Sequence, residues 1–376
     1  MHGTSAWLRT LLTFSYSQSS VILRQQVRTC FPRASRHLCA IPHSPSTAPA
    51  VFTIYYNDVY KVPLPPNHRF PMQKYEDVRR RIQAVIHSSS NEEEGDDDPT
   101  FCVSPMVSLT DLETTHCSDY IARFLRGDQT ETEQRNVGFP WSPAGVRRAL
   151  SSTGGTVAAA LAAADSSGWA AHVAGGTHHA FFDYGEGFCV FSDIAVAANV
   201  VRQRYPDRIR RVLILDLDVH QGNGNAVLFQ DDPDVFTFSM HCCANYFSKK
   251  ESSDLDIELP SGCTDATYLA TLRHWLKRLK EEAGPFDFVF YQAGVDILHC
   301  DRLGRMEVSP EGVARRDQLV FEFCRELGVP LTITMGGGYP KSTVEWEPII
   351  EAHANVCIEA YLFRKSWIHS LAERPA

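Results

Sequence analysis

The chain has 376 residues, of which 44% are hydrophobic and 22% charged, and its formal net charge is −9. Such a length and composition are typical of a folded protein with one large domain or two smaller ones. No apolar run reaches the length of a transmembrane helix, so the sequence predicts no membrane span.

Eleven cysteines are scattered along the chain without a CxxC pair. This pattern favours free thiols in a reducing compartment over a disulfide framework or a cysteine zinc site.

Residues 1–50 differ in composition from the rest of the chain. They hold five arginines, eight serines and no acidic residue, which is typical of an organelle import sequence. We therefore expect import into a plastid or mitochondrion, with a disordered extension as the alternative. The whole chain has a net charge of −9, and residues 1–50 contribute +5, so residues 51–376 alone have a formal charge of −14. A body this acidic argues against direct nucleic-acid binding and suits a cationic, lysine-rich substrate.

The body begins with a strand-like run at residues 51–60, followed by a proline-rich turn and a helix within residues 61–86. Residues 87–100 are polar and acidic, so we expect an exposed loop there.

From that loop onwards, helical and strand-like segments alternate. Helices are expected at 156–164 and 194–206, and strands at 170–176, 211–220, 234–240, 286–294 and 330–338. The strands are short, almost continuously apolar runs, as in sheets that are buried on both faces. We therefore predict an α/β fold with one domain over residues 51–376, in three layers (α/β/α) around a mainly parallel sheet.

Four of the apolar runs are followed by polar residues on their C-terminal side. These residues are His178, His179, Asp216, Asp218, His220, Asp296 and Tyr339. In an open parallel sheet, ligands bind beyond the carboxyl ends of the strands, so we expect these side chains to meet at one rim.

Asp218, His220 and Asp296 are the candidate metal ligands. In a strand, residues two apart share a face, so Asp218 and His220 are expected to hold one ion together. Two carboxylates and one imidazole leave a coordination position open, as in catalytic zinc sites. The alternative is a set of aspartates that cap turns. Several unpaired acids within one apolar run favour the metal, because burial without a cation is costly.

His178 and His179 form a tandem pair after two glycines, which makes them the candidate bases. Asp216 is expected to accept the Nδ1–H of one of them and orient it. Tyr339 follows three glycines, where a phenol is able to donate to a developing oxyanion.

Together these segments resemble the zinc-dependent histone deacetylases, over roughly residues 52–362. The matching pieces run in the family's order: PLPPNHRFPMQKY, THCSDYIARF, GGTHHA, GEGFCVFSDIAVA, DLDVHQGNG, AGVDILHCDRLG and GGGYP. The HQGNG and TGGT pieces look most like the class IV branch. The resemblance implies the arginase/deacetylase fold and removal of acyl groups from lysine side chains of histones or other proteins.

The resemblance also implies residue roles. It assigns one zinc ion to Asp218, His220 and Asp296, a proton shuttle to His179 and an electrostatic role to His178. It makes Asp216 the partner of His178 and, with Ser239, a ligand of a structural potassium ion, and it makes Tyr339 the carbonyl-polarising group. The implied substrate-binding residues are Gly187 and Phe188 in one channel wall, Tyr246 or Phe247 in the opposite wall, and Gly337.

The chain departs from many members of the family at Asn223, where they carry a second aspartate. Since an amide does not stabilise an imidazolium by charge, we expect His179 to be less basic. A dinuclear arginase-type hydrolase would need a carboxylate at position 222, which is glycine here.

Two other functions stay open. One is an amide deacylase on the same fold that acts on acetylpolyamines or other small molecules, and the other is a non-catalytic corepressor scaffold that binds acyl-lysine. The family association favours chromatin regulation, transcriptional repression in a corepressor complex and a nuclear or cytoplasmic location, in contrast to the N-terminal composition.

Overall fold

The computed structural model describes residues 52–66, 68–89, 98–245, 249–342 and 344–372. In this part of the chain, eight strands form one parallel sheet in the order β2-β1-β3-β8-β7-β4-β5-β6. The strands are β1 (Thr53–Tyr56), β2 (Thr100–Val103), β3 (Trp169–His172), β4 (Val212–Asp216), β5 (Val235–Cys242), β6 (Leu255–Leu259), β7 (Phe288–Gln292) and β8 (Leu331–Thr334).

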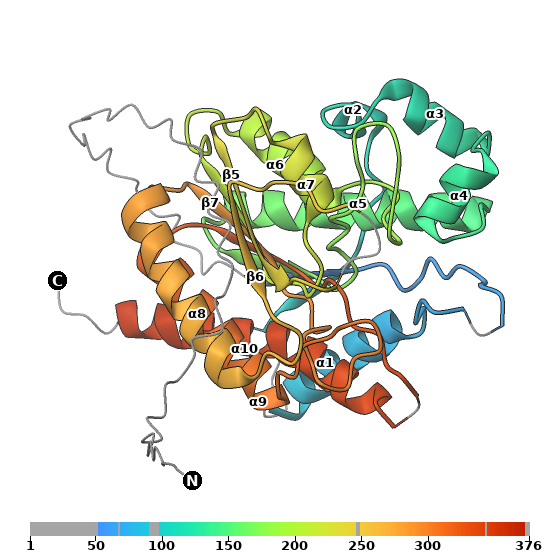
Figure 1. Cartoon of the computed structure of the whole chain (residues 1–376). Coiled ribbons are helices and arrows are strands. Elements are labelled where there is room, and N and C mark those ends of the chain that lie inside the picture. Colours follow the sequence, from blue (N-terminus) through green and yellow to red (C-terminus); the bar gives the residue numbers. More distant parts are fainter. Residues whose placement is uncertain (1–51, 67, 90–97, 246–248, 343, 373–376) are drawn as a thin grey trace, which may run out of the picture.

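Helices cover both faces of the sheet (Figure 1). One layer holds α1 (Lys74–Ser89), α8 (Asp265–Arg278), α9 (Pro310–Leu327) and α10 (Trp346–Ala372). The other holds α2 (Leu109–Leu112), α3 (Ser118–Arg126), α4 (Glu131–Val137), α5 (Pro143–Asp165), α6 (Asp193–Arg204) and α7 (Asn223–Leu228). The predicted three-layer α/β/α fold with a parallel sheet is thereby confirmed.

The apolar strands are explained by burial on both sides. In β4, Leu213 and Leu215 pack into the core beneath α8, α9 and α10, whereas Val212 and Ile214 pack into the core beneath α5 and α6. All four side chains are at most 1% exposed. Since successive strand residues point to opposite faces, a strand between two helical layers must be apolar at every position.

The predicted helices and strands are present, but their boundaries differ from those in the structure, and two differences are described here. The helix expected at residues 156–164 is the C-terminal part of α5, which begins at Pro143, where the Ser142 hydroxyl accepts from the backbone N–H of Gly145. The glycines within α5 allow close packing, since a Cβ at Gly154 would lie 2.1 Å from the carbonyl oxygen of Pro105. The second difference is at the expected acidic loop, residues 87–100.

Helix α1 extends to Ser89 and β2 begins at Thr100, so both ends of the expected loop belong to regular elements. Residues 90–97, like the N-terminal extension 1–50, lie outside the described residues. None of the helices in the described part is long and apolar enough to cross a membrane.

Candidate functional site

The candidate site lies beyond the carboxyl ends of four adjacent strands, β3, β8, β7 and β4. The loop after β3 carries His178 and His179, and the segment after β4 carries Asp218 and His220. Asp296 follows β7 and Tyr339 follows β8. The parallel sheet therefore brings together segments that are up to 161 positions apart in the sequence.

The expectation that Asp218 and His220 are strand residues is wrong. Strand β4 ends at Asp216, and residues 218–220 form a bend. The Asp216 carboxylate accepts from the N–H of Asp218 at 3.1 Å, and the Asp218 carboxylate accepts from the N–H of His220 at 3.0 Å. Aspartates that bind the backbone two residues further on form Asx turns, which compete with a sheet ladder.

Asp218, His220 and Asp296 nevertheless meet. Each offers one ligand atom, and these atoms lie within 4.8 Å of one another. Nδ1 of His220 is 3.1 Å from Oδ1 of Asp218 and 3.1 Å from Oδ2 of Asp296. Both carboxylates are at most 1% exposed, and His220 is 8% exposed.

This donor set fits a divalent cation. One imidazole nitrogen carries at most one hydrogen, yet two buried carboxylate oxygens converge on it. Burial and the charge of Asp218 raise the pKa of Asp296 to about 6. Although burial opposes it, the two carboxylates raise the pKa of His220 to about 10. A divalent ion bound by the two carboxylates and the imidazole would offset the repulsion between the two buried negative charges, and zinc accepts all three donors.

Backbone glycines hold the two acids in place. The N–H of Gly337 donates to Oδ2 of Asp218 at 2.8 Å. A Cβ at Gly337 would lie 2.0 Å from Oδ2 of Asp296, and one at Gly294 would lie 2.2 Å from Oδ2 of Asp218. The predicted substrate-binding residue Gly337 therefore contacts the metal cluster directly, and neither glycine position has room for a side chain.

The tandem histidines stack with their ring centroids 4.0 Å apart. Nδ1 of His178 lies 2.7 Å from Oδ2 of Asp216, and Nδ1 of His179 lies 2.7 Å from Oδ1 of Asn223. The expectation that Asp216 orients one of the histidines therefore agrees with this geometry, and its partner is His178. Because each oxygen accepts from Nδ1, each Nε2 is left facing the site.

The two histidines differ in basicity. Burial disfavours the charged form of His178, but the carboxylates of Asp216 and Asp218 outweigh it and raise its pKa to about 9. Burial, followed by the charges of His178 and His220, holds the pKa of His179 well below its ordinary value. His179 is thus the neutral imidazole of the pair, and its partner Asn223 adds no charge.

Tyr339 is anchored through its backbone. Its N–H donates to Oδ2 of Asp301 at 2.6 Å, and the other carboxylate oxygen accepts from the N–H groups of Leu303 and Gly304. Burial and the charge of Asp296 raise the pKa of the Tyr339 phenol well above its ordinary value. The phenol therefore stays protonated and is able to donate a hydrogen bond.

The predicted channel wall is an unusual piece of backbone. Gly187 and Phe188 have φ angles of 56° and 68°, in the left-handed region that non-glycine residues rarely occupy. Their N–H groups donate to the carbonyl oxygens of Asn136 and Val137, at 3.0 and 2.8 Å. The Phe188 ring lies 6.1 Å from that of Tyr339.

The opposite-wall candidates Tyr246 and Phe247 lie outside the described residues. Ser239 lies beside Asp216 in the β4–β5 register, and its hydroxyl is 3.0 Å from Nδ1 of His241. The potassium site at Asp216 and Ser239 stays a prediction.

Several buried charged residues that support the site were missed in the sequence. Lys74 is 1% exposed, and its ammonium donates to the carbonyl oxygen of Gly338 at 3.0 Å. Arg316 is fully buried and donates to the carbonyl oxygen of Gly294 at 2.5 Å. Asp193 accepts from the N–H groups of Gly176 and Thr177, in the loop that leads to the tandem histidines.

One available signal for Lys74 was its place in the PLPPNHRFPMQKY segment. Asp193 likewise lies in the GEGFCVFSDIAVA segment, whereas Arg316 lies in none of the matching segments and its burial is set by tertiary packing.

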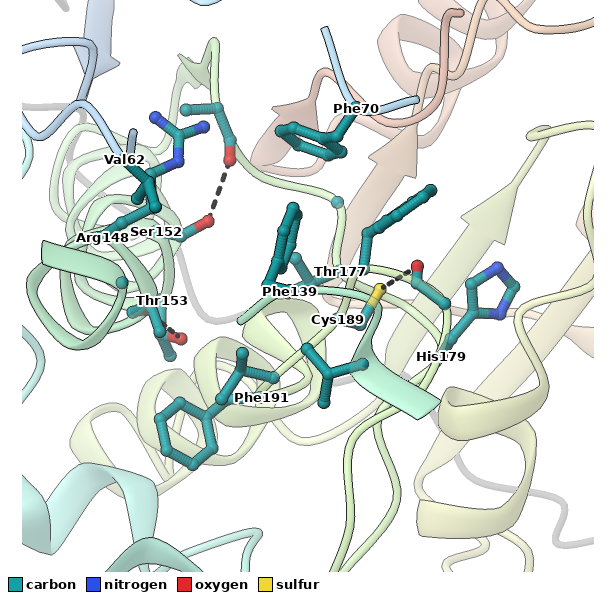
Figure 2. A pocket seen from close by; sticks show the side chains of 18 of the residues that line it. Val62, Phe70, Phe139, Arg148, Ser152, Thr153, Thr177, His179, Cys189 and Phe191 are labelled. Atoms are coloured by element: carbon teal, nitrogen blue, oxygen red, sulfur yellow. Dashed lines mark hydrogen bonds between the residues drawn. The ribbon is translucent and has the colours of Figure 1, made fainter. Parts of the chain in front are cut away.

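A cavity of about 100 Å³ adjoins the site (Figure 2). His178, His179, Asp218 and Tyr339 line it together with residues of α5. Figure 2 shows His179 on one side of this cavity and Arg148 of α5 on the other, with Phe139 and Thr177 between them. The cavity therefore extends well past the tandem histidines.

Known proteins resemble this chain in sequence and in structure. An uncharacterised protein of Picosynechococcus sp. is 43% identical over 292 residues, which are 77% of this chain and 93% of that protein. Histone deacetylase 2 of Arabidopsis thaliana is 39% identical over 193 residues, and the match covers 50% of this chain and 49% of that protein. The polyamine deacetylase HDAC10 of Rattus norvegicus is 36% identical over 159 residues, 38% of this chain and 26% of that protein.

The crystal structure of a histone deacetylase homologue from Aquifex aeolicus has the same fold. It superposes with a TM-score of 0.68 at 23% identity and covers 83% of this chain and 84% of its own. The sequence model of the histone deacetylase domain matches residues 75–355, which include the candidate metal ligands, the tandem histidines and Tyr339. The chain belongs to the histone deacetylase family.

Proposed function

We propose that this chain is a zinc-dependent hydrolase that removes acetyl or longer acyl groups from the lysine side chains of proteins. The observation that carries the proposal is the buried Asp218–His220–Asp296 cluster next to a tandem histidine pair and a protonated tyrosine. A scaffold that only binds acyl-lysine has no need for this complete set.

Asp218, His220 and Asp296 would hold the zinc ion. The chemistry that zinc supplies when bound is Lewis acidity, which polarises an amide carbonyl and acidifies water. Two negative ligands moderate that acidity, so a separate base is needed.

His179 is the base that this geometry favours. Asn223 accepts its Nδ1–H, which leaves the lone pair of Nε2 pointing into the site. The lowered pKa keeps this nitrogen unprotonated at neutral pH. It takes a proton from the attacking water and later returns one to the departing lysine nitrogen. His178, charged and paired with Asp216, contributes a fixed positive charge close to the reacting carbonyl.

Tyr339 stabilises the charge that develops on the carbonyl oxygen. A phenol with a raised pKa remains a donor, and its anchored backbone needs little reorganisation during the reaction. An apolar wall at Phe188 favours a neutral acyl-amide over a charged lysine, since a bare ammonium is costly to desolvate. The product lysine therefore leaves more readily than the substrate.

The second candidate is a small-molecule amide deacylase that acts on acetylpolyamines. It is favoured by the sequence similarity to a polyamine deacetylase, and it would use the same site residues. The negative charge of the body suits either a polyamine or a lysine-rich protein tail.

The first experiment compares hydrolysis of acetyl-lysine peptides, long-chain acyl-lysine peptides and acetylpolyamines by the zinc-loaded protein. Asp296→Ala is the inactive variant, and Asp231→Ala, at an exposed aspartate, is the matched control. Peptide cleavage that only Asp296→Ala abolishes supports the proposal. Cleavage of polyamines alone would favour the second candidate, and no cleavage despite one bound zinc per chain would favour the scaffold.

We also propose that residues 1–50 direct the protein to a plastid or mitochondrion. The support is the arginine- and serine-rich, acid-free composition of this segment. A fluorescent protein fused to residues 1–50 should enter the organelle; nuclear fluorescence of the full-length fusion would instead favour a role in chromatin and a corepressor complex.

A further inference from the structure

The inner end of the cavity carries a cation that the proposed reaction does not use. Arg148, on α5, lines the cavity and is partly exposed to it. Its guanidinium lies 4.0 Å above the ring of Tyr75, which also lines the cavity. One nitrogen, Nη1, donates to Oδ1 of the buried Asn57 at 2.8 Å.

Arg148 lacks a charged partner. Within the described part of the chain, no carboxylate lies within ion-pair distance of its guanidinium. The nearby Asp58 is taken by Arg79, whose Nη2 lies 2.8 Å from its carboxylate. Of the described residues that line the cavity, Asp218 is the only acid, and it belongs to the metal cluster. An arginine stays protonated at neutral pH even when burial lowers its pKa, as it does here.

The surroundings of Arg148 suit a small anion. Tyr75, whose ring lies under the guanidinium, carries a hydroxyl, and Ser152 and Gln129 line the same cavity. The rest of the lining near Arg148 is largely apolar, with Val62, Phe70 and Phe139. A planar guanidinium in such a place matches a carboxylate, which it is able to bind through two parallel hydrogen bonds.

We propose that Arg148 and Tyr75 form a carboxylate subsite at the acyl end of the cavity, which takes the terminal carboxylate of a dicarboxylic acyl-lysine such as malonyl-, succinyl- or glutaryl-lysine. The inference rests on the proposed lysine deacylase function and names its substrate class. The same cavity is lined by His179, by Tyr339 and, on the side opposite His179, by Arg148. An acyl chain whose carbonyl lies at His179 is therefore able to point its free end towards the arginine.

The reaction balances with water alone. Water adds its hydroxyl to the acyl carbon, the amide C–N bond breaks, and the lysine nitrogen gains the proton. The products are a free lysine side chain and a dicarboxylate. In the substrate, the terminal carboxylate neutralises Arg148, whereas an acetyl group leaves this cation facing an apolar cavity.

The test compares kcat/KM for malonyl-, succinyl- and glutaryl-lysine peptides with kcat/KM for the same peptides whose terminal carboxylate is replaced by a neutral amide. We expect the wild type to prefer the best acid over its amide by about tenfold or more. Arg148→Gln should bring this ratio close to one. Arg148→Lys, which keeps the charge without the planar fork, should retain part of the preference.

Arg147→Gln is the matched control, because Arg147 is the preceding residue on α5 and is exposed. It should leave the ratio unchanged. Thermal unfolding of each variant identifies loss of fold, and the ratio of two substrates in one enzyme is insensitive to a partly unfolded fraction.

Four results would overturn the inference or the function on which it rests. A wild type that cleaves acetyl-lysine but shows no preference for acids, or a preference that survives Arg148→Gln, removes the subsite. Inhibition by free acetate that is lost in Arg148→Gln, without a preference for acids, would assign Arg148 to the released acid and overturn the substrate claim. Failure to cleave any acyl-lysine would instead contradict the proposed function itself.

Discussion

Nδ1 of His179 lies 2.7 Å from the amide oxygen of Asn223, an uncharged partner, whereas the stacked His178 has a carboxylate. The two imidazoles are therefore chemically distinct although they are adjacent in sequence. Their pKa values are shifted in opposite directions, which in the proposed reaction would separate proton transfer by His179 from charge stabilisation by His178.

Replacement of Asn223 by aspartate should make His179 more basic. A carboxylate in hydrogen-bond contact raises the pKa of an imidazole by about 1–3 units. A base works only when unprotonated, so the acidic limb of the kcat/KM profile should move to higher pH in Asn223→Asp. The pH–rate profile measures this shift. Asn355→Asp adds the same charge on α10 outside the cavity and should leave the limb in place; an unshifted limb in both variants would exclude His179 as the base.

Removal of the Tyr339 hydroxyl should lower turnover without loss of zinc. Loss of one donor to a developing oxyanion typically costs about 10²–10³ in kcat. Tyr339→Phe keeps the ring, and Tyr184→Phe, at a partly exposed tyrosine outside the cavity lining, is the matched control. Steady-state kinetics measure turnover, and metal analysis measures the zinc content of each variant. Unchanged turnover in Tyr339→Phe would remove the role assigned to its hydroxyl.

A methyl group at Gly337 should disrupt the metal cluster. Its Cβ would lie 2.0 Å from Oδ2 of Asp296 and 2.9 Å from Oδ2 of Asp218, so a ligand or the backbone must move. We expect Gly337→Ala to lower zinc affinity by about 10–100-fold. Equilibrium competition with a zinc chelator measures the affinity. Gly262→Ala is the control for backbone strain away from the cluster: its φ of 71° disfavours alanine, but its Cβ would meet nothing within 4 Å. Equal zinc affinities in the two variants would contradict the packing argument.

His116 should make the folded protein sensitive to acid. Its Nδ1 donates to the carbonyl oxygen of Phe181 at 2.8 Å, and its Nε2 accepts from the N–H of Ser192 at 2.9 Å. Burial lowers its pKa to about 4, from 6.5 for an ordinary histidine. Between these values the unfolded chain binds a proton that the folded protein does not. Its contribution of about 3 kcal/mol is therefore present above pH 6.5 and lost as the pH falls towards 4.

Chemical denaturation at pH 7, 6, 5 and 4 measures this effect. His116→Asn should flatten the dependence of the unfolding free energy on pH, whatever its stability at pH 7. His274→Asn, at an exposed histidine of α8, should keep the slope of the wild type. Parallel slopes in all three proteins would show that His116 does not carry the acid sensitivity.

The sequence allowed the sheet and the site to be predicted because both depend on strong local patterns. Continuous apolar runs identify strands that are buried on both faces, and the polar residues after them mark the rim. The error at Asp218 and His220 has a local cause, because the aspartates of this run bind their own backbone and end β4 at Asp216.

The buried charged residues around the site were harder to predict from the sequence. Lys74 and Arg148 are polar residues of helices, and apart from the matching segment that contains Lys74, the local sequence does not show that their charged ends point inward. Lys74 reaches the backbone of Gly338, 264 positions away, and Arg148 borders a cavity shared by α1, α5 and the loop after β3. Their burial follows from how the helices pack on the sheet.

The order of the strands in the sheet has a consequence for how the chain folds during its synthesis. Strand β8 is the last described strand to leave the ribosome, yet it lies between β3 and β7 and hydrogen-bonds to both. Until Leu331–Thr334 emerge, the β2-β1-β3 and β7-β4-β5-β6 groups have no strand to join them. During synthesis, the edges of β3 and β7 that later pair with β8 are therefore unpaired. Such long-range strand pairing forms slowly. Folding of the nascent chain should therefore depend on chaperones that cover these strand edges until synthesis is nearly complete.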